Sequence, residues 1–288
     1  MEELGRGKLM LVATPIGNLE DMTYRAVRVL QEADLIAAED TRGSLKLLNH
    51  FDIHTPMTSY HQNNRIEKAR VLVEKMLGGT TIALVTDAGT PGISDPGEDL
   101  VRMSLEAGIP VTSIPGACAC ITALTMSGQA TRRFCFEAFL PPDKKPRQEV
   151  LEELKEETRT IVMYEAPHRL VRTLKELAQV LGSERPVTLC RELTKKHEEN
   201  FVSTLGGLIE RYETGDEPRG ECVLVIAGRD RREMKLEQQQ EWRRLSPGEH
   251  VRLYEEQGMD RKAAMKAAAK DRGVSKSDLY RQLLEENE

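Results

Sequence analysis

The sequence contains few aromatic residues, no long apolar run and no excess of positive charge. Aromatic side chains make up 4% of the 288 residues, which limits base stacking as a way to hold a nucleic acid. No stretch of about 18 apolar residues occurs, so a membrane-spanning helix is not expected. The N-terminus, "MEELGRGKLMLVATP", lacks the basic-then-apolar layout of a signal peptide. We therefore expect a cytoplasmic protein that does not contact a membrane.

Cysteines at the spacing of a metal site or a disulfide framework are also missing. The five cysteines are odd in number, and none forms a CxxC pair. They are Cys118, Cys120, Cys135, Cys190 and Cys222. Because they lie in or beside apolar segments, we expect reduced thiols that pack mostly in the core, and no bound metal.

The charge balance restricts the partners. The formal net charge of −6 argues against a protein coated in basic surface, so any contact with nucleic acid has to come from a local patch. With 39% hydrophobic and 31% charged residues, the composition is ordinary for a folded globular protein. The length allows two modest domains and a small appendage.

Short apolar runs alternate with amphipathic stretches from the start of the chain. Expected strands lie within residues 8–15, 34–40, 81–89 and 110–116. Helical patterns cover residues 19–33 and 66–79, and Gly78 and Gly79 end the second one. This alternation predicts βαβ units on a largely parallel sheet.

The alternation breaks near residues 126–148, where small and polar residues precede a new strand and a Pro- and Lys-rich loop follows that strand. We therefore predict an N-terminal α/β domain over residues 1–130 and a second α/β domain over residues 131–229. The second domain has expected strands within residues 159–167, 185–193 and 220–228. Residues 230–241 have almost no apolar periodicity and are expected to form a charged linker, with a charged helix as the alternative.

The tail, residues 242–288, has a different composition. "MDRKAAMKAAAKDRG" is Ala-rich with apolar positions at helical spacing, and Gly273 suits the end of that helix. "SKSD" resembles a capping box that starts a second helix, so the pair predicts a helix-turn-helix. Seven Lys or Arg against two Asp between Arg261 and Arg281 form a local basic patch. A small helical hairpin solvated by its lysines is the alternative.

Four loops with small, turn-forming residues follow expected strands. They span residues 13–18, 86–97, 114–119 and 164–169. Ligands of open parallel sheets bind outside the carboxyl ends of strands, so these loops predict a common site. Each loop taken alone is also consistent with a strand-to-helix turn that needs Gly or Pro for steric reasons. No GxGxxG or GxxxxGK[ST] pattern is present, which favours a ligand held without a phosphate cradle.

Several segments carry a resemblance to a known family. "LVATPIGNLEDMTYRAVRVLQEADLIAAEDTR", "LVTDAGTPGISDPGEDLV" and "IPGACACITAL" resemble signature segments of the tetrapyrrole methylases. "FLPPDKKPR", "YEAPHRLVRTL" and "CRELTKKHEE" extend the likeness to residues 8–228. Within the tetrapyrrole methylases, these segments resemble most closely the RsmI family of 16S rRNA cytidine 2′-O-methyltransferases. The tail is similar to the helical appendage of many members.

The resemblance implies two αβα domains of the tetrapyrrole methylase type with a cleft between them, plus the small helical appendage. It also implies a homodimer that binds S-adenosyl-L-methionine in the cleft. The cofactor residues carried over by motif are Ile16, Gly17, Asp87, Gly89, Thr90, Cys118, Ala119, Tyr164, Glu165, Glu221 and Cys222. The implied reaction is methyl transfer to the ribose 2′-hydroxyl of a decoding-region cytidine in 16S rRNA of the small ribosomal subunit.

A ribose hydroxyl is a poor acid, so a general base or hydrogen-bond acceptor should lie near it. The candidate catalytic residues are Asp40, Asp87 and His168. Each has a structural alternative. Asp40 suits the cap of a helix beginning near Ser44 or a pair with Arg42, Asp87 suits its own loop or the cofactor, and His168 suits the start of the next helix.

Contacts to RNA phosphates must come from local positive charge. The candidates for RNA binding are Arg42, Lys144, Lys145, Arg147, Arg169, Lys195, Lys266 and Lys270. For each of them, the alternative is an ordinary solvent-exposed surface residue that does not contact RNA.

Two other functions compete with the implied one. A tetrapyrrole C-methyltransferase of the precorrin type shares the fold, but it needs no basic helical tail. A non-enzymatic helix-turn-helix DNA-binding regulator predicts duplex binding with a steep salt dependence and no methyl transfer.

Overall fold

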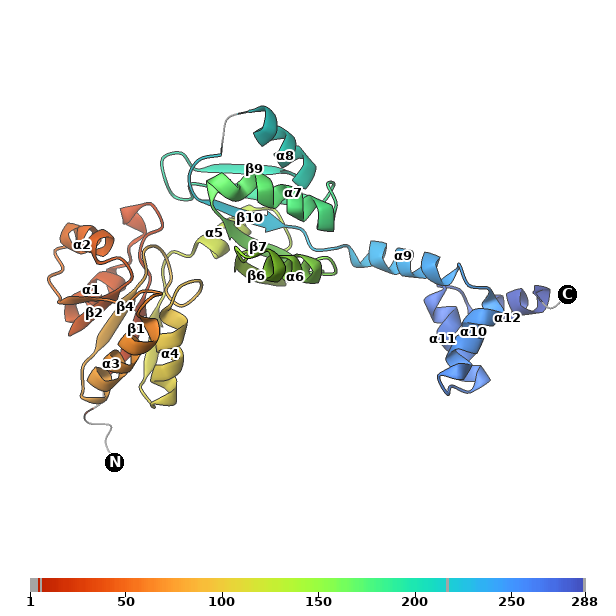
Figure 1. Cartoon of the computed structure of the whole chain (residues 1–288), viewed down its shortest axis with the longest axis horizontal. Helices are drawn as coiled ribbons and strands as arrows, with labels where there is room; N and C mark the ends of the chain where they lie inside the picture. The colour runs from red at the N-terminus through yellow and green to blue at the C-terminus, as the bar shows by residue number, and fades with distance from the viewer. Residues whose placement is uncertain (1–4, 6, 216–217, 287–288) are drawn as a thin grey trace. The chain divides into compact units, whose positions relative to one another are not determined.

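The computed structural model describes residues 5, 7–215 and 218–286, and its contacts divide the chain into two compact units (Figure 1). One unit contains the chain up to Leu154 together with Arg159–Ala227. The other contains Lys155–Thr158 and the chain from Gly228 onward. The ends of the predicted N-terminal domain and of the tail lie outside the described residues. The predicted boundaries near residues 130 and 229 stay predictions.

The first sheet is parallel throughout, as the alternating pattern predicts. Its strand order is β3-β2-β4-β1-β5, and Leu9 of β1 lies opposite Ile82 of β4 and Val111 of β5. The strands are β1 Leu9–Val12, β2 Leu35–Ala38, β3 Met57–Ser59, β4 Ile82–Val85 and β5 Val111–Ile114. The helices around this sheet are η1 Leu19–Asp21, α1 Tyr24–Glu32, α2 Thr41–His50, α3 Arg65–Leu77 and α4 Gly97–Glu106.

Helices cover both faces of this sheet, so its central strand is apolar at every position. Ile82 and Leu84 of β4 pack in one cluster with side chains of α3 and α4. Ala83 and Val85 pack in a second cluster with side chains of α1. Successive side chains of a strand point to opposite faces, which divides the run between the two clusters.

The second sheet is mixed rather than parallel, with strand order β6-β7-β10-β8-β9. Only β6 and β7 run parallel, and the other neighbouring pairs are antiparallel. Its strands are β6 Phe134–Phe139, β7 Thr160–Glu165, β8 Pro186–Arg191, β9 Glu199–Thr204 and β10 Cys222–Ile226. The accompanying helices are α5 Ala119–Met126, α6 Lys144–Leu154, η2 Pro167–Arg169, α7 Leu170–Leu181 and α8 Leu205–Thr214. The segment "CRELTKKHEE" therefore includes the loop of a β8–β9 hairpin.

The two faces of the second sheet also bury separate clusters. Side chains of α6, α7 and α8 pack with Ile161, Leu189 and Leu224 on one face. Side chains of α5 pack with Val162 and Val223 on the other face. Ile16, from the loop after β1, joins this second cluster. The first loop of the chain is thus packed against the second sheet.

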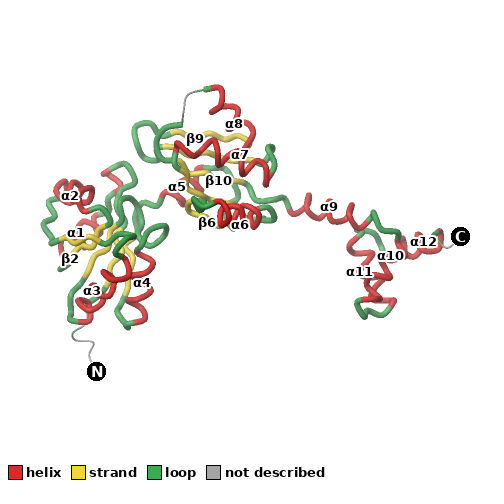
Figure 2. Tube along the Cα trace, in the orientation of Figure 1, coloured by secondary structure: helices red, strands yellow, loops and turns green. Residues whose placement is uncertain are grey.

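The C-terminal unit is helical, with α9 Arg231–Trp242, α10 Pro247–Glu256, α11 Arg261–Asp271 and α12 Lys276–Glu285 (Figure 2). The charged stretch forms helix α9, in agreement with the charged-helix alternative, and Asp230 caps it by accepting the N–H of Arg232. The predicted tight turn between α11 and α12 is present. Gly273 has φ +65°, and the Ser275 hydroxyl accepts the N–H of Asp278 at the start of α12.

None of the helices among the described residues is both long and apolar enough to cross a membrane.

Candidate active site

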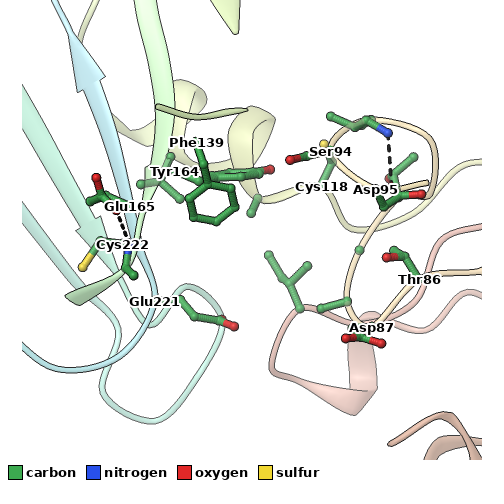
Figure 3. A pocket seen from close by; sticks show the side chains of 18 of the residues that line it. Thr86, Asp87, Ser94, Asp95, Cys118, Phe139, Tyr164, Glu165, Glu221 and Cys222 are labelled. Carbon is green, nitrogen blue, oxygen red and sulfur yellow. Dashed lines mark hydrogen bonds between the residues drawn. The ribbon is translucent and has the colours of Figure 1, made fainter. Parts of the chain in front are cut away.

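A cavity of about 460 Å³ lies in the first unit, where loops after β1, β4, β5 and β7 meet the start of β10 (Figure 3). Its lining comes from both sheets. The lining residues are Ile16, Thr86, Asp87, Ala88, Gly89, Thr90, Ile93, Ser94, Asp95, Cys118, Ala119, Phe139, Tyr164, Glu165, Ala166, Pro167, Glu221, Cys222 and Val223. The volume is in the range of small-molecule sites in proteins.

The glycine-rich loop after β4 is tied to two other loops. Gly89 and Thr14 exchange both backbone hydrogen bonds, with N···O distances of 2.9 and 3.1 Å. Gly89 has φ +82°, and a Cβ there would lie 3.0 Å from Cγ2 of Ile16. The Thr90 hydroxyl donates to the carbonyl of Ala117 at 2.9 Å. A larger residue at position 89 would therefore be strained and would crowd the pocket wall.

Asp95 shapes the rest of the same loop. Its carboxylate accepts the N–H groups of Gly92 at 2.7 Å and of Gly97 at 2.8 Å. Gly92 has φ +79°, so the backbone turns sharply before α4 begins. Asp95 lines the cavity and was not among the predicted site residues. The turn signal "SDPG" could have identified it.

Asp87 and Asp40 lie at neighbouring strand ends. Oδ1 of Asp87 accepts the backbone N–H of Asp40 at 2.9 Å. Asp40 in turn caps α2, since its Oδ1 accepts the N–H of Arg42 at 2.9 Å. The helix begins at Thr41, three residues earlier than the sequence predicts. Asp87 lines the cavity, whereas Asp40 and His168 are not among its lining residues.

Cys118 and Cys120 lie side by side at the start of α5, with 3.4 Å between their sulfurs. The backbone N–H of Cys120 donates to the Tyr164 hydroxyl at 3.2 Å. The hydrogen bond from Cys120, aided by backbone N–H groups of the helix start, lowers the pKa of Cys118 to about 6. The same contact raises the pKa of Cys120, and burial raises the pKa of Tyr164. Cys118 is therefore the acidic thiol of the pair.

Glu165 is a buried carboxylate in the pocket wall. It accepts hydrogen bonds from the Thr173 hydroxyl at 2.5 Å and from the N–H of Ala166 at 2.8 Å. Nε of Arg169 lies 3.1 Å from its Oε1. Next to it, burial raises the pKa of the Cys222 thiol to about 12, so Cys222 is a neutral wall residue.

Ten of the eleven predicted cofactor residues line this one cavity, and Gly17 is the exception. Figure 3 shows Tyr164 and Glu221 on one side of it and Asp87 and Cys118 on the other. Phe139 was missed, since it belongs to an apolar strand. A register shift between Phe136 and Phe139 leaves Phe139 half exposed at the cavity, with its ring centroid 5.5 Å from that of Tyr164.

The predicted RNA-binding residues lie in different environments. Arg42, Lys144, Lys145, Lys266 and Lys270 are exposed.

Three others are engaged with carboxylates. Arg169 pairs with Glu165, and Lys195 pairs with Glu192 and Glu221. Arg147 is buried, its Nε is 2.6 Å from Glu176 and its guanidinium also donates to Thr173. The prediction that Arg147 contacts RNA is therefore wrong, because its guanidinium is used inside the protein.

No group of three or more His, Cys, Asp or Glu side chains among the described residues is arranged to hold a metal ion.

Comparison with known proteins places this site in a family. The family model described as Tetrapyrrole (Corrin/Porphyrin) Methylases matches residues 8–209. The chain is 48% identical over 276 residues to Ribosomal RNA small subunit methyltransferase I of Halalkalibacterium halodurans, covering 96% of this chain and 94% of the relative. It is 43% identical over 286 residues to the protein of that name in Escherichia coli O157:H7, covering 98% and 96%.

Solved structures show the same fold at lower identity. A diphthine synthase matches with a TM-score of 0.61 and 14% identity, over 77% of this chain and 90% of that one. The uroporphyrin-III C-methyl transferase of Thermus thermophilus, complexed with S-adenyl homocysteine, matches with a TM-score of 0.54 and 23% identity, over 77% and 97%. The chain belongs to the tetrapyrrole methylase family and, within it, to the ribosomal RNA small subunit methyltransferase I proteins.

Proposed function

We propose that this protein transfers a methyl group from S-adenosyl-L-methionine to the ribose 2′-hydroxyl of a decoding-region cytidine in 16S rRNA. The observation that carries the proposal is the single cavity lined by ten of the eleven residues assigned to the cofactor by motif. Relatives at 43–49% identity over nearly the whole chain are named as small-subunit rRNA methyltransferases, which supports the substrate class.

The residues of the cavity fit this cofactor. Gly89 and Thr90 bring backbone groups to the wall, which suits hydrogen bonding to a nucleoside. The carboxylates of Asp87 and Glu221 favour a ligand that carries an amino and a sulfonium cation. When bound, S-adenosyl-L-methionine supplies an electrophilic methyl group on sulfur. A Cβ at position 89 would crowd Ile16, so the smallness of Gly89 keeps space for a ligand.

The chain must align the attacking hydroxyl and keep water away from the methyl group. Ile16, Phe139, Tyr164 and Val223 belong to the apolar and aromatic part of the wall and suit this exclusion. Among the three candidate bases, the cavity position favours Asp87. Its Oδ1 accepts the N–H of Asp40, and no hydrogen bond to its Oδ2 occurs among the described residues, so Oδ2 can accept the hydroxyl proton.

The substrate is expected to be the assembled small subunit in the cytoplasm. Exposed Arg42, Lys144 and Lys145 in the first unit and Lys266 and Lys270 in the tail are proposed to contact RNA phosphates. Few aromatic residues and an acidic net charge favour recognition of shape and phosphates over a free single strand. A homodimer is proposed as the active form, on the basis of the resemblance alone.

Transfer of labelled methyl groups tests the proposal. The chain is incubated with labelled S-adenosyl-L-methionine and with small subunits from a strain that lacks the modification. Naked 16S rRNA and a porphyrinoid serve as competing acceptors. We expect label in the RNA of the subunits. Label in the porphyrinoid alone would indicate the tetrapyrrole C-methyltransferase, and no label in any acceptor would contradict the proposed enzyme.

A further inference from the structure

The loop between β8 and β9 has an unusual backbone. Glu192 has φ +50° and Thr194 has φ +63°, both in the left-handed region that favours glycine. Three hydrogen bonds hold this conformation. The N–H of Glu192 donates to the carbonyl of Glu221 at 3.1 Å, that of Lys195 to the carbonyl of Glu192 at 3.0 Å, and that of Thr194 to Oε2 of Glu198 at 2.6 Å. Strained residues persist where surrounding contacts determine them, and they cluster at functional sites.

The ammonium group of Lys195 is held by two carboxylates. Nζ lies 3.0 Å from Oε1 of Glu192 and 3.0 Å from Oε2 of Glu221. The same Oε1 of Glu192 accepts the backbone N–H of Glu221 at 3.0 Å. Partial burial opposes the charge of Lys195, but these two hydrogen bonds outweigh it and raise its pKa. Lys195 is thus a fixed cation beside Glu221, which lines the cavity.

The stem of Lys195 lies over the loop after β1. A Cβ added to Gly17 would be 2.4 Å from Cγ of Lys195 and 3.1 Å from the carbonyl oxygen of Leu193. Glycine at position 17 therefore leaves the space that the lysine stem occupies. Because Ile16 lines the cavity directly beside Gly17, Lys195 connects the first loop of the site to its last one.

We propose that Lys195 is a positioning residue of the cofactor pocket rather than a contact to RNA. It fixes Glu221 and the loop of Ile16 and Gly17 in the positions that the cofactor needs. This inference rests on the proposed function, since it concerns the same pocket.

The local charge argues against the alternative role. Nζ of Lys195 already lies between the carboxylates of Glu192 and Glu221, and these carboxylates disfavour the approach of a phosphate. A phosphate would also have to displace two hydrogen-bonded carboxylates from Nζ. The neighbouring Lys196 is exposed and has no ion pair among the described residues, so it provides a matched control in the same loop.

The experiment compares Lys195→Met with Lys196→Met in the full chain. S-adenosyl-L-methionine affinity is measured by calorimetry, and small-subunit binding is measured over a range of salt concentrations. We expect Lys195→Met to weaken cofactor binding about tenfold, which corresponds to about 1.4 kcal/mol, and to leave the salt dependence of subunit binding unchanged. Lys196→Met should bind the cofactor like the wild type. Lys195→Arg should recover part of the loss, because it keeps the charge.

Glu192→Gln provides a second variant if Lys195→Met does not fold. Glu192 does not line the cavity, so weaker cofactor binding by this variant would report the loss of the anchor of Lys195. Where Lys195→Met folds, the effects of the two substitutions should be non-additive in the double variant.

The outcomes separate this inference from the proposed function. The inference would be overturned if both Lys195→Met and Glu192→Gln kept the wild-type cofactor affinity, and if the slope of log K for subunit binding against log salt concentration fell by about 1 in Lys195→Met. That result would make Lys195 a phosphate contact. A wild-type chain that binds no S-adenosyl-L-methionine would overturn the proposed function, and the inference with it.

Discussion

The carboxylate of Asp87 accepts a hydrogen bond from the backbone N–H of Asp40, with 2.9 Å between Oδ1 and N. The two residues are far apart in the chain, but they follow the adjacent parallel strands β4 and β2. Asp87 therefore fixes both its own loop at the cavity and the start of α2. Substitutions at either position act on one connected element, and their effects on catalysis should not add.

Replacement of Asp87 separates its possible roles. Asp87→Ala removes the acceptor for the N–H of Asp40 and a cavity carboxylate, so we expect loss of most cofactor affinity and a cost in stability of about 1 kcal/mol. Asp87→Asn keeps an acceptor oxygen and should retain stability while losing turnover. Calorimetry and urea unfolding measure the two effects. Full cofactor affinity in Asp87→Ala would remove Asp87 from the cofactor site.

Asp40 is an N-cap, and its cap can be kept while its charge is removed. Asn caps helices as well as Asp does, so Asp40→Asn should be as stable as the wild type, whereas Asp40→Ala should lose about 1 kcal/mol. If Asp40 acts only as a cap, Asp40→Asn keeps the wild-type kcat. A large fall in kcat at unchanged stability and cofactor affinity would instead identify Asp40 as the base.

Cys118 should be the most acidic thiol of the pocket. Its pKa of about 6 predicts that alkylation by iodoacetamide accelerates as the pH rises through 6 and then levels off near neutral pH. Cys120→Ala removes the main cause of this shift and should move the midpoint towards the value of an ordinary thiol. Bound S-adenosyl-L-methionine should slow the reaction. Peptide mass spectrometry identifies the modified residue, and a midpoint above pH 8 in the wild type would contradict the described contact.

His250 should make the stability of the tail depend on pH. Its ring is fully buried and stacks with Trp242 and with Tyr254. Nε2 lies 3.6 Å from Oδ2 of Asp271, and neither ring nitrogen has a hydrogen-bond partner among the described residues. Burial, together with the charge of Arg272, lowers its pKa, although Asp271 acts in the opposite direction. His250 then binds a proton more readily in the unfolded chain than in the folded one. The contribution of the neutral, buried ring to the stability of the tail is therefore present above about pH 6.5 and is lost as the pH falls below it.

Trp242 reports this transition directly, because it is the only tryptophan of the chain and stacks on His250 with 4.3 Å between ring centroids. Urea unfolding followed by its fluorescence should show a lower midpoint at pH 5.5 than at pH 7.5. His250→Phe, which cannot be protonated, serves as the control and should remove most of the difference. Equal midpoints in the wild type would contradict the prediction.

Lys266 and Lys270 lie one helical turn apart on α11 and are both exposed. If they contact phosphates, the double variant Lys266→Ala/Lys270→Ala should bind the small subunit more weakly, and the slope of log K against log salt concentration should fall by about 2. Its cofactor affinity should stay unchanged. Filter binding at several salt concentrations measures this. An unchanged slope would indicate that these lysines only solvate the tail.

Strands β1, β2, β4 and β5 of the parallel sheet could be predicted from sequence because each lies in a short segment with apolar residues between amphipathic helical patterns. The same pattern predicts the site, since parallel strands end at one edge of a sheet. Strands β3 and β9 were both missed. Strand β3 is only three residues long at a sheet edge, and "ENFVST" of β9 is polar and half exposed at a sheet edge. The antiparallel order of the second sheet depends on long-range pairing, which local periodicity does not contain.

The side-chain partners were harder to predict than the loops. Arg147 stands in the polar stretch "DKKPR", but it lies on the inner face of α6 with Leu151 and Leu154. Lys195 meets Glu221 only through the folded β8–β9 and β10 segments. Such contacts depend on tertiary structure, so a charged residue alone indicates neither a buried anchor nor a phosphate contact.

The position of the transferred methyl group on the RNA distinguishes a ribose 2′-O-methyltransferase from any other methyltransferase. Small subunits that lack the modification are methylated with labelled S-adenosyl-L-methionine, and their RNA is digested to nucleosides and analysed by mass spectrometry, with Asp87→Ala as the control. The account predicts label in 2′-O-methylcytidine with the wild type and none with the control. Label on a base, or wild-type yield with Asp87→Ala, would contradict the account.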